Sequence, residues 1–167
     1  MKQLADWFFQ LLEALMVLLL ALMSIMVFTN VVLRYGFNSG FNESEELARF
    51  MFIWLTFIGA IVAMRDGGHL GVDMVVRLLS PGWRKAAVTL SYLLMLGCCV
   101  VFFWGLAMQH DLNMANTGMV TGISLGFVYG VAYLSTLSMA AILVLRLVAL
   151  YTGRMTADDL IAVGEGE

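Results

Sequence analysis

The sequence predicts an all-α integral membrane protein, a four-helix bundle that forms a single domain over residues 1–167. Hydrophobic residues make up 62% of the chain and charged residues 13%, whereas in a soluble domain about half of the residues are apolar and about a quarter are charged. The mean hydropathy is +0.91. Four apolar runs are each long enough to cross ~30 Å of hydrocarbon as a helix that rises about 1.5 Å per residue.

Short polar segments separate the predicted spans. The spans cover residues 11–33, 44–64, 84–108 and 122–146, after an amphipathic lead-in over residues 1–10. Four apolar residues between the second and third spans recur at helical spacing and predict a short amphipathic helix over residues 70–80, lying along the membrane surface. These residues are Val72, Val75, Val76 and Leu79. The polar, acidic tail over residues 152–167 is expected to be mobile.

The start of the second span is acidic. Asn42 is a suitable N-cap, and Glu43, Glu45 and Glu46 fall in the first turn, where the helix dipole favours negative charge. Arg49 follows Glu45 by four residues and Glu46 by three, so we expect it to pair with one of these carboxylates. Two interpretations stay open for this group. It is either an ion or proton relay, or a capped helix start that also holds a partner helix, and the second is favoured.

The exit of the second span carries a second charged group. Its members could bind lipid headgroups, hold a partner or solvate the exit, and we favour anchoring to a partner or to lipid. This group is Arg65, Asp66, His69 and Asp73, and Arg77 is assigned to the same kind of contact. Arg34, in the turn after the first span, is assigned to the same kind of contact.

Glycines recur every fourth residue at the start of the fourth span. They are Gly118, Gly122, Gly126 and Gly130. On one helix such a series stacks small residues on a single face and permits close backbone approach. The sequence leaves open whether another helix of this chain or a partner packs there.

The distribution of lysine and arginine predicts the orientation. With four spans, the two termini and the connection after the second span share one side, which carries most of the basic residues. They are Lys2, Arg65, Arg77, Arg84, Lys85, Arg146 and Arg154. The other side has Arg34, with Arg49 just inside the helix. The positive-inside rule therefore places both termini in the cytoplasm and the acidic start of the second span at the periplasmic face.

The sequence contains no recognisable catalytic pattern. Phosphate-loop, Gly-x-Ser-x-Gly and His-Glu-x-x-His motifs are absent, and no basic cluster suits nucleic acid. His69 and His110 are expected on opposite membrane sides, where they cannot share a metal or a haem. Cys98 and Cys99 are adjacent in an apolar run and are interpreted as packing residues. We expect no enzyme activity, cofactor or metal.

Two stretches carry a resemblance to a known family. The first runs from Asn30 to Tyr35. The second begins with Glu45-Glu46-Leu47-Ala48-Arg49 and continues through Trp54, Gly59-Ala60, Arg65, Gly68-His69 and Val72-Asp73. In these residues, and in length and helix count, the chain resembles the small membrane subunit of tripartite ATP-independent periplasmic (TRAP) transporters.

The resemblance implies the partners and the driving force. It implies a scaffold for a large multi-span subunit that carries the substrate and sodium sites, and a periplasmic protein that delivers an organic acid, such as a carboxylate or sialic acid. The stretch from Arg34 to Glu46 would help to dock that protein. Transport would be driven by sodium, in the bacterial inner membrane.

Two alternatives remain from the residues alone. One is a homo-oligomeric small channel or exporter with the glycine series at the subunit contact. The other is the membrane anchor of a redox complex.

Overall fold

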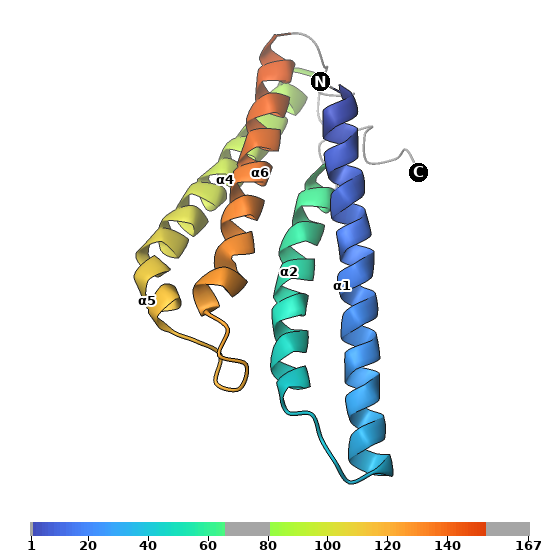
Figure 1. The fold of residues 1–167 in the computed structure, drawn as a ribbon. Coiled ribbons are helices and arrows are strands. Elements are labelled where there is room, and N and C mark those ends of the chain that lie inside the picture. The colour runs from blue at the N-terminus through green and yellow to red at the C-terminus, as the bar shows by residue number, and fades with distance from the viewer. Residues whose placement is uncertain (1, 66–80, 153–167) are drawn as a thin grey trace.

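The computed structural model describes residues 2–65 and 81–152. These residues form helices and contain no β-strand. The helices are α1 (Lys2–Gly36), α2 (Glu43–Arg65), α4 (Pro81–Met108), α5 (His110–Ala115) and α6 (Leu125–Tyr151) (Figure 1). Four of them are long and apolar enough to cross a membrane. The predicted all-α membrane fold is confirmed. The predicted surface helix over residues 70–80, and the tail after Thr152, lie outside the described residues.

Helix α1 is one continuous helix of 35 residues. From Lys2 onward, the lead-in predicted over residues 1–10 and the predicted first span form one uninterrupted helix. Nothing in the stretch from Lys2 to Tyr35 breaks a helix, because it contains neither glycine nor proline. The helix ends at Gly36, and Asn38 follows it with a φ of 49°.

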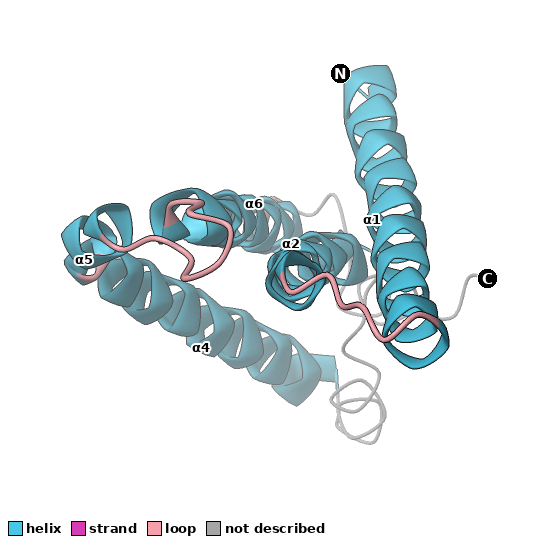
Figure 2. Ribbon diagram, turned by 60° about the horizontal axis from the view of Figure 1, so that its bottom comes forward, coloured by secondary structure: helices cyan, strands magenta, loops and turns pink. Residues whose placement is uncertain are grey.

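The four long helices pack in the spatial order α1, α2, α6, α4. Helix α1 lies against α2, α2 against α6, and α6 against α4, so that α1 and α4 form the two edges (Figure 2). Helix α2 is therefore an interior helix, and Ile61 on it has no exposed surface. On α1, by contrast, only 6% of the span is buried within the chain.

Two apolar clusters hold the helices together. The first joins α1, α2 and α6 through Leu12, Ile58, Ile61 and Val131. The second joins α4 to α6 and to the end of α2, and its buried members include Met64, Tyr92, Cys99 and Leu143. Cys98 and Cys99 are both free thiols, and only Cys99 is buried.

Polar contacts between helices add to this packing. The buried hydroxyl of Ser135 on α6 donates a hydrogen bond to the carbonyl oxygen of Phe57 on α2, at 3.0 Å. The Tyr133 hydroxyl donates to the carbonyl oxygen of Leu106 near the end of α4, at 2.7 Å. Interhelical hydrogen bonds of this kind are worth about 0.6 kcal/mol on average in membranes, so they fix the register of the helices more than they drive association.

The bundle has two distinct ends. We call the end with the α1–α2 turn and the loop over residues 116–124 the loop end. We call the opposite end, where α1 and α4 begin and α2 and α6 finish, the terminal end (Figure 1). Between the two ends, α1 and α4 expose large apolar side chains such as Val17, Phe28, Val101 and Trp104. A bilayer or an apolar partner must cover such surfaces.

Candidate functional site

At the loop end, Glu46 holds the loop over residues 116–124. Its Oε2 accepts hydrogen bonds from the backbone N–H of Val120 at 3.1 Å and of Thr121 at 2.7 Å. Gly118 lies against the same carboxylate, and a Cβ atom there would stand 2.8 Å from Oε1 of Glu46. The first turn of α2 and a segment more than 70 residues further along the chain are thereby joined through one side chain.

The neighbouring turn between α1 and α2 forms a polar pocket of about 490 Å³. Asn30 fixes the turn, since its Oδ1 accepts a hydrogen bond from the backbone N–H of Phe41 at 2.9 Å. Arg34 and Glu45 line the pocket and form an ion pair of 3.9 Å, with side chains 69% and 70% exposed. An ion pair this long and exposed contributes little stability, so both groups are available to a partner.

The expected pairing of Arg49 with Glu45 or Glu46 is absent from the structure. Glu46 turns toward the 116–124 loop and Glu45 toward Arg34. Arg49 is exposed, and it forms no ion pair with any residue in the part of the chain that the structure describes. The expectation was wrong because backbone N–H groups of a distant loop, which spacing within one helix cannot reveal, compete for the carboxylate.

At the terminal end, Arg65 joins three helices. Its guanidinium lies 3.2 Å from Asp6 and 3.8 Å from Glu13, both on α1, and 4.2 Å above the ring of Phe9. Arg146 on α6 donates a hydrogen bond to the carbonyl oxygen of Arg65 at 2.6 Å, which places a cation at the C-terminus of α2. Arg65 therefore serves contacts within its own chain, and its expected role toward lipid or a partner stays a prediction.

The remaining charged residues assigned to the exit of the second span are not described. Asp66, His69, Asp73 and Arg77 lie in residues 66–80, outside the described part of the chain. Their assignment to a partner or lipid contact stays a prediction.

The glycine series does not lie on one helix face, contrary to the prediction. Helix α6 begins at Leu125, so Gly118 and Gly122 belong to the preceding loop. Gly122 has a φ of +69°, a conformation that favours glycine over other residues. Ser124 caps α6, its side chain accepting a hydrogen bond from the backbone N–H of Gly126. The first three glycines therefore have separate roles. Gly118 makes a buried contact in the loop, Gly122 forms a turn, and Gly126 lies at the start of α6.

Only Gly126 of the series packs closely inside the helical part. A Cβ atom at Gly126 would stand 2.5 Å from Sδ of Met114 on α5, whereas nothing lies within 4 Å of one at Gly130. We expect Gly126→Leu to push aside the Met114 side chain, which is 52% exposed, and to lower the free energy of unfolding by about 1 kcal/mol, the low end for overpacking. Thermal unfolding of the detergent-solubilised protein measures this. Gly130→Leu is the matched control and should leave the melting temperature unchanged or raise it. Equal melting temperatures for both variants would contradict the expectation.

An apolar groove runs between α2, α4 and α6. It has a volume of about 590 Å³ and is lined by residues of all three helices, among them Phe57, Cys98, Phe102 and Met139. The groove exists because α4 packs on α6 while its contact with α2 is slight. Its lining suits hydrocarbon and offers little to a charged solute.

Comparison with known proteins decides the family. Residues 23–153 match the family described as tripartite ATP-independent periplasmic transporters, DctQ component. The match covers most of the chain, including α2, α4, α5 and α6. The chain belongs to this family of TRAP transporter subunits. The resemblance found in the sequence is confirmed, and the protein is a multi-pass membrane protein.

Individual relatives of this TRAP subunit carry related names. A TRAP transporter small permease protein of Haemophilus influenzae is 39% identical over 149 residues, 89% of this chain and 92% of that protein. The C4-dicarboxylate TRAP transporter small permease protein DctQ of Vibrio cholerae is 31% identical over 90 residues, 54% of this chain and 37% of that protein. The sialic acid TRAP transporter permease protein SiaT of H. influenzae is 31% identical over 85 residues, 51% of this chain but 14% of that protein. These names describe transporter subunits rather than enzymes.

Sequence reasoning did not identify three contact residues of this TRAP subunit, namely Asp6, Val120 and Thr121. Asp6 and Glu13 are seven residues apart and so share one helix face, and this spacing was a usable signal for a basic partner on the next helix. Val120 and Thr121 act through backbone N–H groups. No side-chain pattern signals such a role, because every residue except proline carries the same donor.

Proposed function

We propose that this chain is the non-catalytic small subunit of a sodium-driven, binding-protein-dependent TRAP transporter for organic acids. It would hold a large multi-span subunit in the bacterial inner membrane while part of that subunit moves. The match to SiaT carries the proposal. Since the 85 matched residues are 14% of that permease protein, a segment similar to this chain occurs there within a much longer polypeptide. In SiaT the similar segment is part of one long permease chain. We therefore propose that this chain is a separate subunit that binds a large permease.

The distribution of polar groups supports a scaffold. In the described part of the chain, a pocket with charged residues lies in the α1–α2 turn, and the groove between α2, α4 and α6 is lined by apolar side chains. A further pocket near α5 has only uncharged polar groups in its lining, among them Gln109 and Asn113. An organic anion cannot cross hydrocarbon without charged or polar partners. The substrate path is therefore assigned to the large subunit, and the exposed apolar faces of α1 and α4 are assigned to lipid and to that subunit.

The orientation proposed for the bundle places the terminal end in the cytoplasm. That end gathers Arg65, Arg84, Lys85 and Arg146, as the positive-inside rule requires. The loop end would face the periplasm. There, the exposed Arg34 and Glu45 offer charges of both signs to an arriving binding protein, and such charges steer transient encounters.

The names of two relatives support a proposal for the substrate class. One is named for C4-dicarboxylates and another for sialic acid, and both substrates are carboxylates. We therefore propose an organic acid as the substrate of the whole transporter, selected by chains other than this one.

Arg49 provides a test of the scaffold role. It is an exposed cation inside a span with no ion pair to another described residue, and an unpaired charge in the membrane is unfavourable. If the large subunit supplies the counter-charge, Arg49→Glu should lower the amount of large permease that co-purifies from membranes by about tenfold and reduce uptake of the acid in cells.

Arg49→Lys serves as the matched control, because it keeps the positive charge. Unchanged co-purification and uptake with Arg49→Glu would defeat the assignment of Arg49. Transport by the isolated chain in liposomes, or its purification from native membranes without any large permease, would defeat the scaffold role itself.

A further inference from the structure

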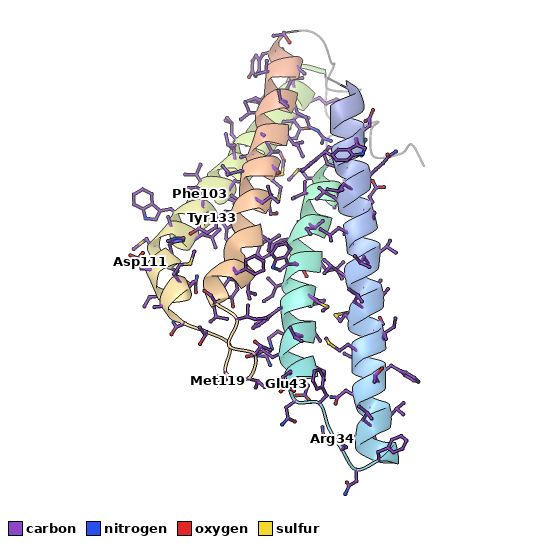
Figure 3. The ribbon with its side chains drawn as sticks, viewed as in Figure 1. Arg34, Glu43, Phe103, Asp111, Met119 and Tyr133 are labelled. Carbon is purple, nitrogen blue, oxygen red and sulfur yellow. The ribbon has the colours of Figure 1, made fainter. Side chains whose placement is uncertain are left out.

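The 116–124 loop turns at two apolar residues, Met119 and Val120, which we call the apolar tip. Met119 is 100% exposed and Val120 is 50% exposed. The tip lies at the loop end of the bundle, near the first turn of α2 (Figure 3). A fully exposed methionine makes no contribution to the packing of its own chain, so its side chain is available to another surface.

The backbone that carries the tip is fixed. Within the loop, the N–H of Gly118 donates to the carbonyl oxygen of Ile123 at 2.8 Å, and the N–H of Gly122 donates to the carbonyl oxygen of Gly118 at 3.0 Å. Thr117 and Ser124 pair as an isolated β-bridge. The carboxylate of Glu46 adds two more hydrogen bonds from the side of α2. A preformed loop loses little conformational entropy on binding, which favours a defined partner surface.

The composition of the loop argues against a role as a bilayer anchor. Anchors at the membrane interface are rich in tryptophan, tyrosine, lysine and arginine, and residues 115–124 contain none of these. Exposed interfacial aromatics occur at both ends of the bundle, for example Trp7 and Trp83 at the terminal end and Tyr35 beside the α1–α2 turn, but the 116–124 loop carries none. Methionine, in contrast, is enriched at protein interfaces, where its flexible side chain adapts to the partner.

The charges around the tip indicate what kind of partner surface would fit it. The loop itself is uncharged. Glu43 precedes Glu46 by three residues and therefore lies on the face of α2 that meets the loop, and it forms no ion pair with another residue of the described ranges. A fitting surface therefore offers an apolar hollow with a lysine or arginine at its rim.

We propose that Met119 and Val120 dock into such a hollow on the large multi-span subunit; this rests on the proposed function. Two partners meet the loop end under that function. Permanent interfaces are more apolar than transient ones, and charges serve transient encounters. The uncharged tip therefore belongs to the permanently bound large subunit, whereas the exposed Arg34 and Glu45 belong to the binding protein.

The experiment places a photo-crosslinking residue, p-benzoylphenylalanine, at position 119 of the full-length chain in native membranes. Irradiation should give an adduct with the large permease, identified by mass spectrometry. In parallel, Met119→Lys should lower the recovery of the large permease on purified small subunit by about tenfold. Met119→Leu should keep full recovery, and Ser39→Lys, an equal charge on the other loop of the same end, should keep it as well. All three variants should melt like the wild type, because Met119 and Ser39 are exposed.

Each outcome decides the proposal. An adduct with phospholipid alone, an adduct with the soluble binding protein, or no adduct while the wild type still co-purifies with the large permease would overturn it. Full recovery of the large permease with Met119→Lys would overturn it too, and in these cases the scaffold function stands. If the wild-type chain brings down no large permease at all, the proposed function fails, and the docking proposal fails with it.

Discussion

Arg65→Glu is expected to lower the free energy of unfolding of the isolated chain by about 2–3 kcal/mol. The change removes the cation that lies 3.2 Å from Asp6 and 4.2 Å above Phe9. It also brings a third carboxylate next to Asp6 and Glu13. The side chain of Arg65 is 35% exposed, so solvent screens each of its contacts. The total loss of unfolding free energy is therefore well below the loss expected for a fully buried ion-pair network. Thermal or denaturant unfolding in detergent measures the loss.

A charge swap tests whether the loss comes from the pair with Asp6. The double variant Arg65→Glu with Asp6→Arg should recover part of the stability, and the non-additive part of the cycle measures the coupling. Arg49→Glu is the matched control on the same helix. No described residue pairs with Arg49, so the variant should cost the isolated chain only about 0.5 kcal/mol, from repulsion between the new carboxylate and Glu45 and Glu46. Loss of stability from Arg49→Glu equal to that from Arg65→Glu would contradict this account.

Glu46→Ala is expected to release the 116–124 loop. The variant removes the acceptor of the backbone N–H groups of Val120 and Thr121 and leaves the apolar tip on a mobile segment. Hydrogen exchange at these two amides should accelerate by about tenfold or more, while amides in the middle of α2 stay protected. Under the docking proposal the same variant also weakens binding to the large permease, because the tip is no longer preformed.

Two variants serve as controls for the loop. Glu45→Ala changes a carboxylate in the same helical turn that pairs with Arg34 instead, and it should leave exchange at Val120 and Thr121 unaltered. Glu46→Gln keeps an oxygen acceptor and should retain part of the protection. Wild-type exchange rates in Glu46→Ala would show that the loop is held without Glu46.

Membrane helices were predictable because each is a local feature of the chain. The apolar run predicted over residues 44–64, with charged residues at both ends, lies within helix α2 (Glu43–Arg65). The start of the fourth span was predicted at residue 122, whereas α6 begins at Leu125. The glycine period suggested a longer helix, while the local turn at Gly122 and the cap at Ser124 end the loop three residues later. The short helix α5 was missed inside a segment interpreted as a polar loop, because six residues are too few to show a period.

The candidate site was predictable only in its residue types. Glu43, Glu45, Glu46 and Arg34 were chosen from the sequence, and the structure places them together at the loop end, with Arg34 paired to Glu45. What each carboxylate contacts was not predictable. Spacing along one helix favoured Arg49 as the partner of Glu46, but the packing of α2 against α6 brings a loop with free N–H donors to the same oxygen atoms.

By itself, the sequence determined that this protein is an all-α, multi-pass membrane protein of the TRAP family, since the length of each apolar run and the short motifs around α2 depend only on residues near one another in the chain. Tertiary structure alone decided the partners of Glu46 and Arg65 and the exposure of Met119. Glu46 joins α2 to the loop before α6. Arg65 joins α2 to α1 and to α6. Long-range contacts follow from which helix faces pack together, and similar apolar faces on all four helices leave that choice open until the chain has folded.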